Sequence, residues 1–368
     1  MAMTLHRSLN TLAAVVILAS VLPVAEAATP TLPATTRKVI YQKTPDGNRL
    51  VSVEVPVPKP GAGQVLVHMR AIALNGGDIE NLDSTRDRSG MIAASDGAGE
   101  VVALGPDARE FRIGQRVTSM YWRNYNDGPP TGDSFKGALG SNIDGVFGDY
   151  VVVDQSALVP IAPGLSFEEA AALPTAGLTA WSAVMVEGHA GPGKTVLVQG
   201  TGGVSTFALV LAHAAGAKVI VTSSSDEKLQ RARELGADQT INYRTTPEWS
   251  AKVLELTGNH GADIIVEVGG KGTIPQSAKS LADFGTLAIV GGVSGYGGEF
   301  PALTLLEKTA RAVGISVGSR AQLKAMEAFM LKHRVKPPIG RVYPHAQLDE
   351  AIAQMRAGQI VGKVVITL

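Results

Sequence analysis

The chain has 368 residues, of which 45% are hydrophobic, 18% are charged and 42 are glycine, and its formal net charge is zero. This length suits two domains, and the composition is typical of a compact α/β protein rather than a disordered or fibrous chain. A neutral chain without basic clusters does not fit nucleic-acid-binding or polybasic membrane-surface proteins, so we expect a small neutral or modestly anionic ligand.

The sequence contains no cysteine. Disulfides, thiolate nucleophiles, iron–sulfur clusters and cysteine-containing zinc sites are therefore excluded. The lack of cysteine does not fix the compartment, because such a chain tolerates oxidising and reducing surroundings equally well.

Residues 1–27 show the three-part pattern of a secretory signal peptide. Basic residues precede an apolar run from Leu12 to Val24, and Ala25-Glu26-Ala27 follows as a candidate cleavage site. The run is shorter than the roughly 20 residues that span a bilayer, so we expect export to the periplasm rather than a stable membrane span. The alternative is a cytoplasmic protein with an uncleaved extension, or one whose translation starts near Thr36.

Residues 28–158 consist largely of short β-type runs separated by glycine and proline. KVIYQ, LVSVEVPVP, GQVLVHMRAIAL and YVVVD are examples. Such a series predicts a mostly antiparallel β domain. Residues 124–144 are rich in glycine, proline and polar side chains, so we expect a long loop there that borders a substrate cleft.

Strands and helices alternate through residues 159–333. A capping box at Ser166 and Glu169 opens the first helical run, and TVLVQG, KVIVTS, ADIIVEVGG and TLAIVGG follow as predicted buried strands. Helices, SAKSLADFG among them, are predicted between these strands. The alternation predicts an α/β fold with a doubly wound parallel sheet. Residues 334–368 end in the strand GKVVITL, which we expect to return to the first domain.

The stretch VLVQGTGGVST, residues 196–206, is similar to a dinucleotide-binding turn. In that turn the first glycine bends the chain, the second lets the backbone approach a pyrophosphate, and the third lets the helix pack on the strand. Gly200 and Gly202 fill the first two places, and Ser205 fills the third. The helix N-terminus still offers unpaired N–H groups and a positive partial charge, so the turn predicts a phosphate site.

Serines stand at the end of the next strand, where an acidic residue usually holds a cofactor that lacks the 2′-phosphate. Ser223, Ser224 and Ser225 occupy this place, and Lys228 follows one helical turn later. Hydroxyls and a cation favour a 2′-phosphate, so the sequence predicts NADPH over NADH. The same segment also fits a capping box from Ser224 to Glu227, and its acidic residues would weaken a phosphate site.

Taken together, these motifs resemble the medium-chain dehydrogenase/reductase superfamily, in its zinc-free, quinone-oxidoreductase-like branch. The resemblance covers residues 36–368 and is carried by AIALNGGDIENL, SDGAGEVVALG, LPTAGLTAW, VLVQGTGGVS, KVIVTSSSDEK, INYR and GKVVI. It implies a GroES-like substrate domain, built from both ends of the chain, around a central Rossmann domain with the nicotinamide in the cleft between them. It also implies a homodimer joined through the edges of the Rossmann domains.

The resemblance implies roles for particular residues. The phosphate-binding turn falls on Gly202, Gly203 and Val204, and the 2′-phosphate contacts fall on Ser223, Ser224, Ser225, Lys228 and Tyr243. Thr179 matches a threonine near the nicotinamide. Gly269, Gly291 and Val293 lie in turns where members of the superfamily line the cofactor.

The zinc ligands of the superfamily are missing from this sequence. Zinc-containing members place a cysteine at the position of Asn75, a histidine at that of Ser95 and a second cysteine near Thr175. We therefore expect no metal, so hydride transfer would rely on orientation and hydrogen-bond donors, which favours an electrophilic acceptor. We expect Asp78 and Asp96 to be structural carboxylates that fix the active-site loops.

Asn75 is the candidate donor to a substrate oxygen, and Tyr121 or Tyr125 is the candidate proton source. The alternatives are that Asn75 satisfies backbone groups at a turn and that the tyrosines only pack. We expect an NADPH-dependent, zinc-free oxidoreductase that reduces a small quinone, enone or aldehyde. An alcohol dehydrogenase working in the oxidative direction and an NADPH-binding protein with little turnover are the alternatives. Export would place any of these in a compartment poor in NADPH.

Overall fold

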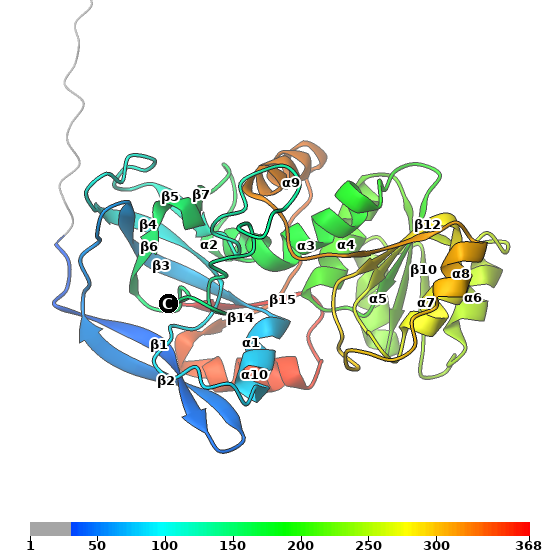
Figure 1. The fold of residues 1–368 in the computed structure, drawn as a ribbon, viewed down its shortest axis with the longest axis horizontal. Helices are drawn as coiled ribbons and strands as arrows, with labels where there is room; N and C mark the ends of the chain where they lie inside the picture. Colours follow the sequence, from blue (N-terminus) through cyan, green and yellow to red (C-terminus); the bar gives the residue numbers. More distant parts are fainter. Residues whose placement is uncertain (1–30) are drawn as a thin grey trace, which may run out of the picture.

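The computed structural model describes residues 31–368, so the predicted signal peptide at residues 1–27 lies outside the described residues. Two lobes lie side by side, one rich in strands and one in which strands and helices alternate (Figure 1). Among residues 31–368, no helix is long and apolar enough to cross a membrane.

The first lobe is built on a seven-stranded sheet in the order β14-β15-β3-β4-β5-β7, with β6 also paired to β3. All of its pairings are antiparallel except that of β14 with β15, so the predicted antiparallel domain is confirmed. A separate antiparallel hairpin joins β1 and β2. The strands are β1 (Thr35–Thr44), β2 (Gly47–Pro56), β3 (Gln64–Leu74), β4 (Asp96–Leu104), β5 (Arg116–Ser119), β6 (Tyr150–Asp154), β7 (Leu158–Pro160), β14 (Ile339–Pro344) and β15 (Lys363–Thr367).

The central strand β3 is buried on both faces, which explains its nearly continuous apolar sequence. Val65 and Val67 pack into the main core of the lobe. Ala71 and Ala73 face the other way and contact the alanines of helix α2 (Phe167–Ala171). The short helix α1 (Gly76–Asp83) begins directly after β3.

The second lobe contains a six-stranded parallel sheet in the order β10-β9-β8-β11-β12-β13. This is the doubly wound sheet that the alternating sequence predicts. Its strands are β8 (Thr195–Gln199), β9 (Lys218–Ser223), β10 (Gln239–Asn242), β11 (Ala262–Glu267), β12 (Leu281–Ile289) and β13 (Arg311–Gly314). The connecting helices are α4 (Gly203–Ala214), α5 (Asp226–Glu234), α6 (Trp249–Leu256), α7 (Ile274–Ser280) and α8 (Ala302–Glu307).

Both faces of this parallel sheet are covered, because successive side chains of a strand point to opposite sides. In β8, Val196 and Val198 pack in one core with Phe207 of α4. Leu197 packs in the other core with Trp249 of α6. The order of the strands reverses between β8 and β11, and ligands of doubly wound sheets bind at such a point.

The predicted helix at residues 277–285 is wrong in its second half. Helix α7 ends at Ser280, and Leu281 is already extended, with φ −72° and ψ 139°. Leu281 and Ala282 are completely buried in the sheet as the first residues of β12. Packing in the sheet therefore overrides the helical pattern of the segment.

Helical turns from residue 167 to residue 187 connect the two lobes. The predicted capping box is confirmed, since Ser166 Oγ accepts from Glu169 N at 3.1 Å and Glu169 Oε2 accepts from Ser166 N at 2.9 Å. After α2 the helix widens into a π-turn over Leu173–Gly177, continues as α3 (Leu178–Trp181) and widens again over Ser182–Glu187. Pro174 lies in the first wide turn and has no backbone N–H to donate in the regular hydrogen-bond pattern of an α-helix.

The expected domain boundary at residue 158/159 falls inside β7, which pairs with β5. Further along the chain, α9 (Arg320–His333) precedes β14, and α10 (Leu348–Arg356) separates β14 from β15. Strand β15 then pairs with β3 in an antiparallel register that places Val364 opposite Leu74. The chain therefore returns to the first lobe, as predicted, and its C-terminus lies there (Figure 1).

Candidate active site in the cleft between the lobes

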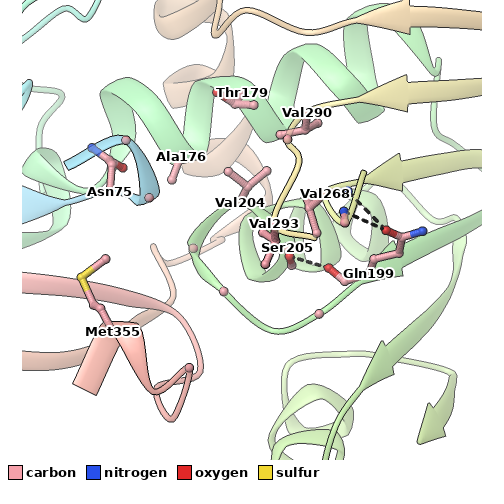
Figure 2. Close-up of a pocket in the computed structure, with 18 of the residues that line it drawn as sticks. Asn75, Ala176, Thr179, Gln199, Val204, Ser205, Val268, Val290, Val293 and Met355 are labelled. Atoms are coloured by element: carbon pink, nitrogen blue, oxygen red, sulfur yellow. Dashed lines mark hydrogen bonds between the residues drawn. The ribbon is translucent and has the colours of Figure 1, made fainter. Parts of the chain in front are cut away.

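A cleft of about 1130 Å³ lies between the lobes and is lined by both. The first lobe contributes the start of α1, Tyr121 and the segment 139–141 of the predicted long loop. The second lobe contributes the ends of the parallel strands around the point where the strand order reverses. Figure 2 shows Asn75, Thr179 and Val293 approaching this space from three different elements.

The glycine turn between β8 and α4 lies on the wall of this cleft, with Gly200, Gly202, Gly203 and Val204 among the lining residues. Gly200 has φ +72°, a conformation that glycine adopts without strain. A Cβ on Gly202 would meet no atom within 4 Å, and no side chain caps α4. The first-turn N–H groups of α4 are therefore available to an anion.

Ser205 does not offer its hydroxyl to the cleft. It is 4% exposed, and its Oγ donates to the carbonyl oxygen of Gln199 at 2.7 Å (Figure 2). The side chain thus links the first turn of α4 to the last residue of β8. Where the usual third glycine brings helix and strand together by leaving space, this chain joins them with a hydrogen bond.

A buried pair, Gln199 and Glu267, holds the ends of β8 and β11 together. Gln199 Nε2 donates to Glu267 Oε2 at 2.7 Å, and Glu267 Oε1 accepts from the backbone N–H groups of Gly269 and Gly270 at 2.8 and 2.9 Å. These bonds shape the turn that carries Gly269 to the cleft. The sequence offered no sign of this pair, because its two members lie 68 residues apart.

The predicted 2′-phosphate residues lie together at one end of the cleft, with one exception. Ser223, Ser224, Lys228 and Tyr243 line it, and Lys228 Nζ donates to Ser224 Oγ at 3.2 Å. Ser225 does not line it, because its side chain caps α5 by accepting from the backbone N–H of Lys228. The capping box predicted from Ser224 is accordingly wrong by one residue.

Two further residues, Arg244 and Asp226, affect the net charge around the predicted 2′-phosphate residues. Arg244 lines the cleft next to Tyr243 and is the last residue of the INYR motif, but it is not among the residues predicted from the sequence. Asp226 accepts from Asn242 Nδ2 at 2.9 Å at the start of α5. Its carboxylate is therefore held by a neighbouring strand, while Lys228 and Arg244 line the cleft beside Ser224 and Tyr243.

The other predicted cofactor contacts also line the cleft. Gly291 and Val293 lie in the segment that follows β12, and Val293 is 88% exposed. The hydroxyl of Tyr296, from the same segment, donates to Glu80 Oε1 at 3.3 Å. Because Glu80 belongs to α1, this contact connects the two walls.

Asn75, Tyr121 and Thr179, the candidate catalytic residues, all line the cleft. Burial raises the pKa of Tyr121, so its hydroxyl keeps its proton at neutral pH. Tyr125 does not line the cleft, since its hydroxyl donates to Gly128 O within its own loop. Of the two tyrosines, only Tyr121 is placed to reach a substrate.

A polar cluster lies beside Asn75 (the Asp96 cluster: Asn75, Ser95, Asp96 and Thr175). Asp96 is completely buried and accepts from Ser95 Oγ at 2.8 Å, from Thr175 Oγ1 at 2.5 Å and from Thr175 N at 3.1 Å. Asn75 Nδ2 lies 3.4 Å from Ser95 Oγ. Asp96 thus fixes the segments on both sides, as expected of a structural carboxylate.

Asp78 also has the expected structural role, because its Oδ2 accepts from Asn75 N at 2.8 Å at the start of α1. Burial raises the pKa of Asp78 to about 7. The backbone of Asn75 is therefore held by Asp78, while its side chain is directed toward the cluster.

The residues of the Asp96 cluster do not fit a zinc ion. They supply an amide, two hydroxyls and one carboxylate that already accepts three hydrogen bonds. In addition, the ammonium of Lys363 lies 2.6 Å from Asn75 Oδ1 and would repel a cation. Within residues 31–368, no three His, Cys, Asp or Glu side chains gather as a metal-binding group.

Comparison with known families matches each lobe to a domain description. Residues 61–163 match the alcohol dehydrogenase GroES-like domain, and residues 203–332 match the zinc-binding dehydrogenase domain. A zinc-type alcohol dehydrogenase-like protein of Schizosaccharomyces pombe is 40% identical over 90% of this chain and 99% of its own length.

Two further proteins are similar over nearly their full length. A quinone oxidoreductase-like protein 2 homolog of Nematostella vectensis is 30% identical over 90% of this chain and 92% of its own. A crystal structure described as an NAD-dependent alcohol dehydrogenase is 33% identical, with a TM-score of 0.80 over 90% of this chain and 99% of that one.

We predict that Ser205→Ala lowers the free energy of unfolding by about 1 kcal/mol, because it removes a buried hydrogen bond. It should leave the dissociation constant of a nicotinamide cofactor unchanged, since the hydroxyl faces Gln199. Urea unfolding and a fluorescence titration measure the two quantities. Ser224→Ala is the matched control and should show the reverse pattern. An S205A variant of normal stability with weakened binding of the nicotinamide cofactor would contradict the structural role.

Proposed function

The chain belongs to the medium-chain dehydrogenase/reductase superfamily of nicotinamide-dependent oxidoreductases, and we propose that it is an NADPH-dependent, zinc-free reductase of small quinones, enones or aldehydes. The observation that carries this proposal is the Asp96 cluster beside the glycine turn. Amide and hydroxyl groups, rather than metal ligands, occupy the part of the cleft where both lobes meet.

The choice of NADPH over NADH rests on the charges at the end of β9. Ser223 and Ser224 stand where an acidic residue would hold the hydroxyls of NADH, and Lys228 and Arg244 line the same end of the cleft. The nearby Asp226 is held by Asn242. Two cations and short hydroxyls suit a 2′-phosphate.

The choice of acceptor follows from the hydrogen-bond donors. When bound, the nicotinamide of the cofactor supplies a hydride. Negative charge then develops on the acceptor oxygen, and the amide of Asn75 is placed to donate to it. Tyr121 retains its proton at neutral pH and can deliver it after hydride transfer. Quinones and enones suit such a site, because they accept hydride without a metal that polarises a carbonyl.

The partner proposed for the chain is a second copy of itself. β13 is the edge strand of the parallel sheet within the described residues, so one row of its backbone groups faces outward. Phe284, Leu303 and Leu306, on and beside α8, are 79%, 65% and 75% exposed. The backbone N–H of Phe284 donates to Lys308 O, so Phe284 lies beside the C-terminal end of α8. An isologous contact through this edge would cover both features.

The proposed activity predicts that the purified protein oxidises NADPH when given one of a panel of quinones, enones and aldehydes. Turnover should persist in a chelator, because no step requires a metal. Absorbance at the nicotinamide band measures the rate, and Asn75→Ala is the control for the donor. Tight NADPH binding without turnover on any acceptor would defeat the proposal in favour of a binding protein. Chelator-resistant reduction of NADP by alcohols alone would instead indicate an alcohol dehydrogenase.

The proposed cofactor predicts that Lys228→Met raises the dissociation constant of NADPH about tenfold through loss of one charge-assisted hydrogen bond. Binding of NADH should not change, since it carries no 2′-phosphate. Lys252→Met removes a cation from the surface of α6 and serves as the control. Equal weakening of both nucleotides in K228M would refute a 2′-phosphate role.

The proposed dimer predicts that the chain has twice its sequence mass in light scattering and that Leu306→Glu makes it monomeric. A buried, unpaired carboxylate opposes the contact. Leu331→Glu is the control, because Leu331 is 66% exposed on α9, away from this edge. A wild-type monomer, or a dimer unaffected by L306E, would rule out this interface.

A further inference from the structure

Lys363, the first residue of β15, is buried at the wall of the cleft with 2% of its surface exposed. Its ammonium donates to Asn75 Oδ1 at 2.6 Å and to the carbonyl oxygen of Leu74 at 2.7 Å. We propose that Lys363 is a positioning residue, which fixes the amide of Asn75 so that its NH₂ group serves as the donor to the acceptor oxygen. This inference rests on the proposed function.

The ammonium determines which way the amide faces. The oxygen and nitrogen of an asparagine side chain exchange places by a half-turn with little change in shape. An ammonium only donates hydrogen bonds, so the amide atom 2.6 Å from Nζ has to be the oxygen. The NH₂ group consequently lies away from Lys363, on the side of Ser95. Its orientation is set before any substrate enters.

Three hydrogen-bonding contacts connect Lys363 to Asp96 in a chain with a single direction. Lys363 donates to Asn75, the NH₂ group of Asn75 points to Ser95 Oγ, and Ser95 donates to Asp96. The two contacts of Asn75 Nδ2, to Ser95 Oγ and Ala73 O, are long at 3.4 and 3.5 Å. The amide hydrogens can therefore form a shorter bond to a substrate oxygen.

The charge of Lys363 strengthens this donor. A cation on the oxygen side of an amide draws electrons toward the oxygen and polarises the N–H bonds. Burial lowers the pKa of Lys363, while the charges of Asp96 and Asp78 favour its protonated form. Asp96 thus opposes the loss of the proton on which the orientation of Asn75 depends, and Asp78 adds to this effect when it is ionised, above its pKa of about 7.

The glycine turn holds the stem of the lysine in place. A Cβ on Gly203 would lie 2.7 Å from Lys363 Cδ, so the stem packs against the first turn of α4. The backbone N–H of Gly362 donates to Thr201 O at 3.0 Å. A cation this close to the glycine turn could also bind a phosphate of the cofactor. Both hydrogen bonds of the ammonium, however, go to the first lobe, to Leu74 O and Asn75 Oδ1.

The test is a double-mutant cycle on the full chain with N75A, K363M and the combined variant. The measured quantities are kcat for quinone reduction at saturating NADPH and the dissociation constant of NADPH. We expect K363M to lower kcat about tenfold in the wild-type background, a small share of what a donor itself contributes. In the N75A background the loss should be less than about twofold, because the lysine acts through that amide.

Asn75→Asp decides the matter if K363M does not fold. A carboxylate keeps a partner for the ammonium but lacks the NH₂ group, so N75D should be as slow as N75A. Full activity of N75D would overturn the inference. So would a double variant whose loss of kcat equals the product of the losses in N75A and K363M, because the two residues would then act independently. A K363M variant with unchanged kcat and NADPH binding weakened more than about tenfold would make Lys363 a phosphate ligand and also overturn the inference.

If the wild-type chain reduces no acceptor, the proposed function fails and the inference fails with it. An active wild type with independent losses defeats the inference alone.

Discussion

The pairing of β15 with β3 is the contact on which the active-site region depends. It brings a segment from beyond residue 360 to the inside of a sheet that begins more than 250 residues earlier, with Val364 opposite Leu74. The same pairing places Gly362 against the glycine turn and Lys363 against Asn75. The strand β15 therefore helps to position one wall of the cleft relative to the other.

The charges around Asn75 show how a buried lysine is accommodated in a hydrogen-bonded site. A buried cation usually needs an anion close by, and here Asp78 and Asp96 influence Lys363 while each also accepts backbone N–H groups. The carboxylates serve two purposes, because they fix loops and balance a buried lysine. The relatives named for zinc and for quinone reduction share this framework, so chemistry within it depends on a few side chains.

Features with a local signature could be predicted from the sequence. The alternation of strands and helices, the glycine turn and the Ser166 cap depend on neighbours within a few residues. Two predictions were wrong because packing or a competing hydrogen bond determined the local structure. Leu281 joins a strand instead of a helix, and Ser225 caps a helix instead of lining the cleft. Lys363 and the Gln199–Glu267 pair could not be predicted, because their partners are distant in sequence. Arg244 could have been predicted, since it follows Tyr243 in the INYR motif.

The late position of β15 has a consequence for biosynthesis. β3 and β4 leave the ribosome early, yet the sheet between β3 and β14 cannot close until β15 has been made. The parallel sheet of the second lobe has no such dependence, because β8 to β13 form an uninterrupted series. A nascent chain can thus fold the nucleotide-binding lobe while the first lobe still has an unpaired strand. The edge of β3 that receives β15 is therefore open to unwanted pairing until the last residues of the chain have been made.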